Sequence, residues 1–160
     1  MVWALERGAD PRAVSDEDNA TLEGVTALIQ AAAHGNEEAV ELLLPLSDPI
    51  ARDKNGLTAL MWAAEWDHFE CVALLLDRGG PLEADPEGMS ALALAARKGQ
   101  EASVALLLPV SDLARRDASG RVAGDWAEDG PCRALFLAFK EARDLSASVA
   151  RAQPSRRPAL

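Results

Sequence analysis

The residues best suited to covalent chemistry are a histidine and a cysteine that lie close together in the chain. His68 and Cys71 are three positions apart, a spacing that places both side chains on one face of a helix. Such a pair could supply a thiolate nucleophile with its base, or half of a metal site. The elements that carry the two residues decide whether either chemistry is plausible.

Three segments of the chain share the same internal order. Residues 24–44, 56–76 and 88–108 each begin with glycine, any residue, Thr or Ser, Ala and Leu, and each ends in a Leu triplet. Their glycines are 32 residues apart, and Gly120 falls at the next step. A repeat of this length indicates a solenoid, because one unit cannot bury its own apolar face and neighbouring units must stack.

Each unit contains two short helical patterns. The first is rich in alanine, and the second has apolar residues at i, i+3 and i+4, which form a stripe on one side of a helix. Thr26, Thr58 and Ser90 precede the first helices, and a hydroxyl oxygen at that position can accept from an exposed amide. Proline or glycine follows each Leu triplet and ends the second helix. We therefore expect helix, turn, helix and loop.

The repeat register provides structural equivalents for the histidine and the cysteine. These are Asn36 and Gln100 for His68, and Ala39 and Ser103 for Cys71. Because small polar or apolar residues take the same places, we interpret the pair as structural. The alternative is a cryptic hydrolase that uses both residues, and it would require a reactive thiol.

Sequence motifs for catalysis are absent. The chain has no phosphate-binding glycine loop, no metalloprotease His-Glu-x-x-His and no Gly-x-Ser-x-Gly elbow. Its two cysteines, Cys71 and Cys132, do not form a Cys-x-x-Cys pair. The sequence therefore predicts no catalytic residues, no metal site and no cofactor.

Charge narrows the class of partner. The chain carries 26 acidic and 16 basic residues, for a formal charge of −10. The first 150 residues hold every acid and 13 of the bases, so their charge is −13, and three later arginines add +3. This balance repels phosphate groups, so it disfavours nucleic acid and membrane surfaces as partners and favours a protein with a basic surface.

The remaining sequence features bear on where in the cell the protein is located. The first residues have neither a basic start nor a long apolar stretch, so we expect no secretion signal, and no apolar run is long enough for a membrane span. Unpaired thiols are typical of a reducing compartment. We expect a cytoplasmic protein, and the nucleus is left open.

The repeated unit resembles the ankyrin repeat. The matching features are Asp-x-x-Gly-x-Thr, a helix with paired alanines and a Val-x-x-Leu-Leu helix, found from about residue 20 to residue 117. The resemblance implies an all-α solenoid of helix–turn–helix units that acts as a non-catalytic protein-binding module. The proline and histidine of the family's Thr-Pro-Leu-His are missing, and each unit is one residue shorter than the usual length of about 33.

The same register divides the chain. We expect one ankyrin-repeat domain over 1–151, made of a partial repeat at 1–19, repeats at about 21–52, 53–84 and 85–116, and a degenerate capping repeat at 117–151. Residues 152–160 are expected to be a disordered tail. A monomer is expected, although an uncapped first repeat leaves open a dimer through that end. The truncated start also leaves open a regulatory fragment of a larger protein, which could be an enzyme.

By register, the resemblance assigns partner contacts to the loop tips and to the ends of the first helices. The predicted partner-binding residues are Lys54, Asn55, Leu57, Glu65, Trp66, Pro86, Glu87, Met89, Arg97 and Lys98. This surface would be the concave face of the solenoid.

Two tryptophans lie one helical turn apart in the second unit. Trp66 aligns with His34 and Lys98, which are polar, so we expect its side chain to be exposed beside Leu57 and Met89. An exposed tryptophan would be a good anchor for a partner. Trp62 is expected instead to fill space left by the missing repeat histidines, and the same filling role is left open for Trp66.

Overall fold

The computed structural model describes residues 26–77, 83–128 and 130–152. Eight helices follow one another in these residues: α2 (Ala27–Ala33), α3 (Glu37–Leu43), α4 (Ala59–Glu65), α5 (Phe69–Leu76), α6 (Ala91–Lys98), α7 (Glu101–Leu107), α8 (Ala123–Trp126) and α9 (Pro131–Ala152). The partial repeat predicted at 1–19 lies outside the described residues, as does the predicted tail beyond residue 152.

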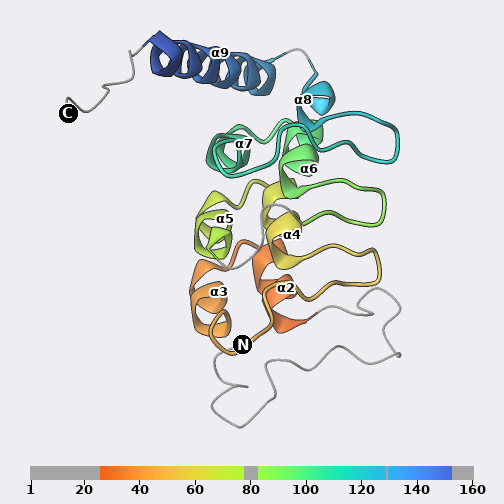
Figure 1. The fold of residues 1–160 in the computed structure, drawn as a ribbon. Coiled ribbons are helices and arrows are strands. Elements are labelled where there is room, and N and C mark those ends of the chain that lie inside the picture. The colour runs from red at the N-terminus through yellow and green to blue at the C-terminus, as the bar shows by residue number, and fades with distance from the viewer. Residues whose placement is uncertain (1–25, 78–82, 129, 153–160) are drawn as a thin grey trace, which may run out of the picture.

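The helices form two rows along the stack (Figure 1). The inner row contains α2, α4, α6 and α8, and each of these helices contacts the next. The outer row contains α3, α5, α7 and α9, which contact one another in the same order. Long loops project from the inner row on the side away from the outer row (Figure 1). This arrangement confirms the predicted all-α solenoid.

Hydroxyl side chains begin the inner-row helices, as the sequence predicts. Thr26 accepts from the Ile29 amide at 3.2 Å, and Thr58 and Ser90 accept from the equivalent amides at 3.3 Å. These bonds satisfy a first-turn amide that has no partner within its helix.

The fourth unit departs from this pattern. Val122 stands at the cap position and has no hydroxyl, and the Asp125 carboxylate instead accepts from the Val122 amide at 3.0 Å. The helix that follows, α8, has only four residues. The degenerate unit therefore keeps the register but shortens its first helix.

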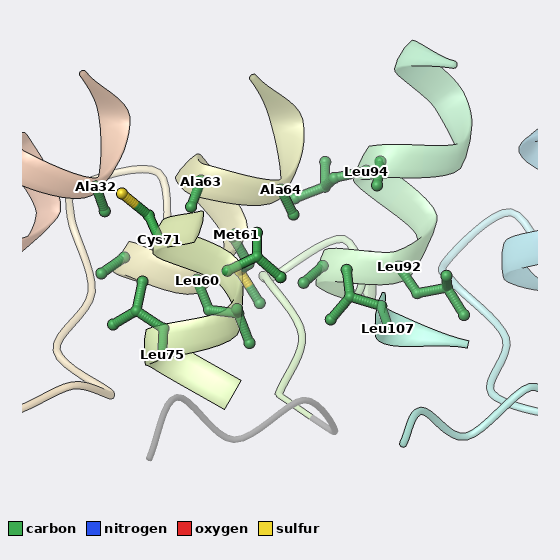
Figure 2. Close-up of a cluster of buried hydrophobic side chains, with 14 of the residues drawn as sticks. Ala32, Leu60, Met61, Ala63, Ala64, Cys71, Leu75, Leu92, Leu94 and Leu107 are labelled. Atoms are coloured by element: carbon green, nitrogen blue, oxygen red, sulfur yellow. The ribbon is translucent and has the colours of Figure 1, made fainter. Parts of the chain in front are cut away.

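The apolar core lies between the two rows. Leucines at equivalent positions of successive units are fully buried, among them Leu60 and Leu92 from the inner row and Leu75 and Leu107 from the outer row (Figure 2). The alanines of the inner row are buried beside them, and their small side chains let neighbouring helices approach closely.

The loops between units are hairpin tips held by backbone bonds. The amide of each repeat aspartate donates to the carbonyl four residues later, at 2.9–3.0 Å, in the pairs Asp53 with Leu57, Asp85 with Met89 and Asp117 with Arg121. Gly56 has a φ of +77° between the first pair, a conformation that glycine adopts without steric cost. Arg52 joins neighbouring tips, because its guanidinium donates to the Ala84 carbonyl at 2.7 Å and pairs with Glu83.

The long helix α9 closes the described end of the stack. Leu135, Phe136 and Phe139 are partly buried and pack against the core, whereas the charged side chains on its other side are exposed. These three apolar residues therefore face the stack.

Candidate functional site

The structure gives His68 a contact within the backbone framework. Its Nε2 lies 3.2 Å from the Ala33 carbonyl oxygen, to which it donates. Gln100 is the equivalent residue one unit later, and its side-chain amide donates to the Glu65 carbonyl at 2.9 Å. Both side chains therefore connect the start of an outer-row helix to the inner-row helix of the preceding unit.

Cys71 has the properties of a core residue. Its side chain is only 1% exposed, and burial raises the pKa of the thiol, with further contributions from the charges of Glu37 and Glu70. A raised pKa keeps the thiol protonated at neutral pH, whereas nucleophilic attack and metal binding need the thiolate. The geometry of Cys71 and its pKa favour the structural interpretation.

We expect Cys71 to react slowly with iodoacetamide in the folded protein. A Cys132→Ser variant leaves Cys71 as the single thiol, and its alkylation can be followed by mass spectrometry at pH 7.5 with and without urea. The reaction should be at least about ten-fold faster after unfolding, because burial blocks both access and ionisation. Equal rates in the two states would contradict the structural role.

The described residues also show no site for a metal. No group of three or more His, Cys, Asp and Glu side chains in that part of the chain is arranged to hold a metal ion. Among the same residues, no helix is both long and apolar enough to cross a membrane.

One hollow brings together seven of the ten predicted partner-binding residues. It lies between two adjacent loop tips and the inner-row helices α4 and α6, has a volume of about 360 Å³ and is lined by Lys54, Asn55, Leu57, Glu65, Asp85, Pro86, Glu87, Leu94 and Arg97. We call it the inter-loop hollow. Trp66, Met89 and Lys98 do not line it.

The prediction that Met89 is exposed is wrong. Its side chain is 4% exposed and belongs to the core, and its amide donates to the Asp85 carboxylate at 2.8 Å. An apolar side chain at this place gains stability by packing against the core, whereas Arg121 at the equivalent place of the fourth unit is exposed. A signal was present, because Val25 and Leu57 occupy the same register and are also apolar. Leu57 is itself partly buried against the core.

Trp66 is exposed, as predicted, and lies among charged side chains. Its exposed fraction is 56%, and the Lys98 Nζ lies 5.9 Å from the centroid of its ring. Lys98 and Arg97 approach the Glu65 carboxylate at 3.3 and 3.6 Å. An accessible tryptophan with neighbouring cations thus stands beside the inter-loop hollow, because Glu65 and Arg97 belong to both groups.

Trp62 fills space, as predicted, and also makes a bond that the sequence interpretation missed. It is partly buried against the core, and its indole N–H donates to Asp53 at 3.0 Å. Trp126 donates in the same way to Asp117 at 2.6 Å. The signal was a spacing of nine residues from aspartate to tryptophan in both units.

Asp85, the aspartate of the unit between these two, has no tryptophan in the described part of the chain that donates to it. Leu94 occupies the position of the two tryptophans, and no side-chain donor from the described residues replaces the indole. The surroundings of Asp85 and Asp117 shift the pKa values of the two carboxyl groups in opposite directions. Burial raises the pKa of Asp85, whereas hydrogen bonds, first from Ser119 and then from Trp126, lower the pKa of Asp117 to about 2.

We therefore expect opposite pH dependences from these two carboxyl groups. The stabilising contribution of Asp117 is present above its ordinary pKa of 3.8 and is lost as the pH falls through about 2. For Asp85, whose pKa in the folded protein is raised, the contribution is present below 3.8 and is lost as the pH rises through the raised value. Carbon-detected NMR titration would measure both. Equal titration midpoints would contradict the distinction.

Comparison with known families identifies one family, whose model matches the chain twice. A model of ankyrin repeats in three copies matches residues 1–84 and 47–117. The two matches together span 1–117 of the 160 residues, which includes the inter-loop hollow. A comparison with curated proteins gave no match.

Proposed function

Because the chain belongs to the ankyrin-repeat family, we propose that it binds a partner protein, without catalysis, through its loop tips and the concave face of its inner row. Ankyrin repeats are generally protein-interaction modules, and stacked repeats use their extended concave surfaces for binding. The observation that carries the proposal is the inter-loop hollow with Trp66 beside it. We further propose the repeat boundaries and the capping role of residues 117–151 that the sequence predicts.

The surface is organised before any partner arrives. Arg52 links the loop tip at 53–57 to residues 83 and 84 of the next loop. The Ala118 amide donates to the Glu87 carbonyl at 2.7 Å and so joins the following pair of tips. A surface that is already ordered loses less conformational entropy on binding, so more of the interaction energy is available as affinity.

The chemistry of the surface fits a protein partner. Exposed tryptophan and arginine are the side chains that most often concentrate binding energy in protein interfaces, and Trp66 and Arg97 are both exposed here. The charge of −13 over the first 150 residues would attract a partner with a basic surface.

Affinity capture from the source lysate tests the proposal. The bait would be the wild type, a Trp66→Ala, Arg97→Glu variant and a Leu42→Ala control, each checked for folding by circular dichroism. Leu42 is suitable because it is 47% exposed and lies on the outer-row helix α3. We expect a partner on the wild type and on Leu42→Ala, with at least about a ten-fold loss on the double variant.

Two results would contradict the proposal. If the double variant retained the partner as well as the wild type did, the binding surface would lie elsewhere. If no bait captured a protein, the chain would not act as a binding module in that lysate.

A further inference from the structure

Three equivalent aspartates allow the units to be compared with one another. In two of them an indole from the inner row covers the carboxylate: Trp62 donates to Asp53 Oδ2, and Trp126 donates to Asp117 Oδ2. The same carboxylates use Oδ1 for amides of their own loop. Each loop tip thus has one oxygen for its own backbone and one for an indole.

The unit between them keeps the aspartate but lacks the indole. Asp85 Oδ1 accepts from its own loop at Met89, and Leu94 replaces the tryptophan. The inter-loop hollow opens at this place, since Asp85 and Leu94 both line it. Its volume of about 360 Å³ falls within the range of about 300–1,000 Å³ that is typical of ligand pockets.

We propose that the inter-loop hollow receives a tryptophan side chain of the partner, whose indole N–H donates to Asp85 as Trp62 and Trp126 donate to Asp53 and Asp117. This inference rests on the proposed function, because it names the chemistry of the partner at the same surface. The partner's indole would complete the one described unit whose aspartate is not covered by an indole of the chain.

The lining of the hollow favours indole over other side chains. Leu57 is partly buried and leaves some apolar surface on the hollow, whereas Leu94 is only 2% exposed. Phenylalanine would contact Leu57 without donating to Asp85. Lysine or arginine would donate, but Lys54 and Arg97 already bring positive charge to the same walls. Indole combines an apolar ring with one neutral donor.

Arg97 adds a further reason. Its guanidinium lies 5.9 Å from the centroid of the Trp126 ring, and the ring also has Arg121 at 4.6 Å. The aromatic ring of the neighbouring unit is therefore already bordered by guanidinium groups. Arg97 also lines the hollow, so an indole there would lie near its guanidinium, and tryptophan is the aromatic side chain that attracts cations most strongly.

The test uses small indole probes, so it does not depend on finding the partner. N-acetyl-tryptophanamide would be titrated into the ¹⁵N-labelled protein up to its solubility limit, with its 1-methylindole analogue, which keeps the amide groups but lacks the indole N–H, as the matched control. We expect saturable shifts at amides 54–57, 85–88 and 94–97. The methylated probe should bind about ten-fold more weakly because it cannot donate to the carboxylate.

Two variants test the position of the probe. Leu94→Trp should place an indole of the chain in the hollow, abolish the shifts and lower the pKa of Asp85 toward that of Asp117. Leu42→Ala on α3 should leave the shifts unchanged. If Leu94→Trp does not fold, Asp85→Asn takes its place and should weaken the tryptophan probe while leaving the methylated probe almost unchanged.

The inference is overturned if no saturable shift appears, if both probes bind equally, or if Leu94→Trp or Asp85→Asn has no effect on a folded protein. These failures differ from a failure of the proposed function. Suppose that the Trp66→Ala, Arg97→Glu variant loses the partner while Leu94→Trp binds it as well as the wild type does. The proposed binding function would then be supported, and the proposal that an indole occupies the hollow would be rejected.

Discussion

Replacement of Leu92 by alanine is expected to lower the free energy of unfolding by about 2–5 kcal/mol, which is typical for a leucine removed from a packed core. Leu92 is completely buried, and it lies in α6 between the neighbours α4 and α8. Urea denaturation followed by circular dichroism measures the change.

A matched exposed leucine provides the control for this substitution. Leu42→Ala removes the same atoms from an exposed site on α3, and surface changes of this kind usually stay within about 0.5 kcal/mol. A loss below about 1 kcal/mol for Leu92→Ala would contradict the stacked core, because the leucine would then not lie between packed helices.

Replacement of Gly56 by alanine should destabilise the fold by about 2 kcal/mol or more. A φ of +77° is unfavourable for alanine, at a cost of about 1–2 kcal/mol. The added Cβ would also overlap with Cδ of Pro86 on the next loop tip. Because a proline ring has little freedom to move away, the two loops that frame the inter-loop hollow would have to separate.

Gly120→Ala separates the two effects. Gly120 has nearly the same backbone conformation, with a φ of +80°, but a Cβ there would meet nothing within 4 Å. We expect Gly120→Ala to lower the free energy of unfolding only by the conformational cost of about 1–2 kcal/mol. If thermal unfolding showed equal losses for both variants, the contact between the loop tips would contribute nothing, and the hollow would have no rigid frame.

The sequence was sufficient for the helices because the repeat supplies the same local signals several times. The caps at Thr26, Thr58 and Ser90 and the ends of the outer-row helices depend on neighbours within four residues. The register also indicated an exposed Trp66, since its equivalents are polar, although it left open a filling role for this residue as well as for Trp62.

The candidate site was harder to predict because its shape depends on contacts between units. Met89 is buried in the core of the stack, which its comparison with exposed tip residues did not show. The inter-loop hollow is lined by Asp85 and by Leu94, which stands where two other units have a tryptophan. The difference between this unit and its neighbours becomes visible only when Trp62 and Trp126 are seen to donate to the equivalent aspartates.

The histidine and cysteine illustrate the opposite case, in which spacing alone suggested too much. His68 and Cys71 have the separation of a reactive pair, but His68 bonds to the Ala33 carbonyl of the preceding unit, and Cys71 is buried. Neither contact can be seen from a separation of three residues. The repeat register indicated the structural role because it showed which residues replace them.

Hydrogen–deuterium exchange of the chain with its captured partner tests the binding surface most directly. Backbone amides of the loop tips and of the last turns of α4 and α6 should gain protection when the partner binds, whereas those of the outer-row helices α3 and α5 should not. Protection confined to the outer row, or equal protection of both rows, would contradict a partner held on the concave face.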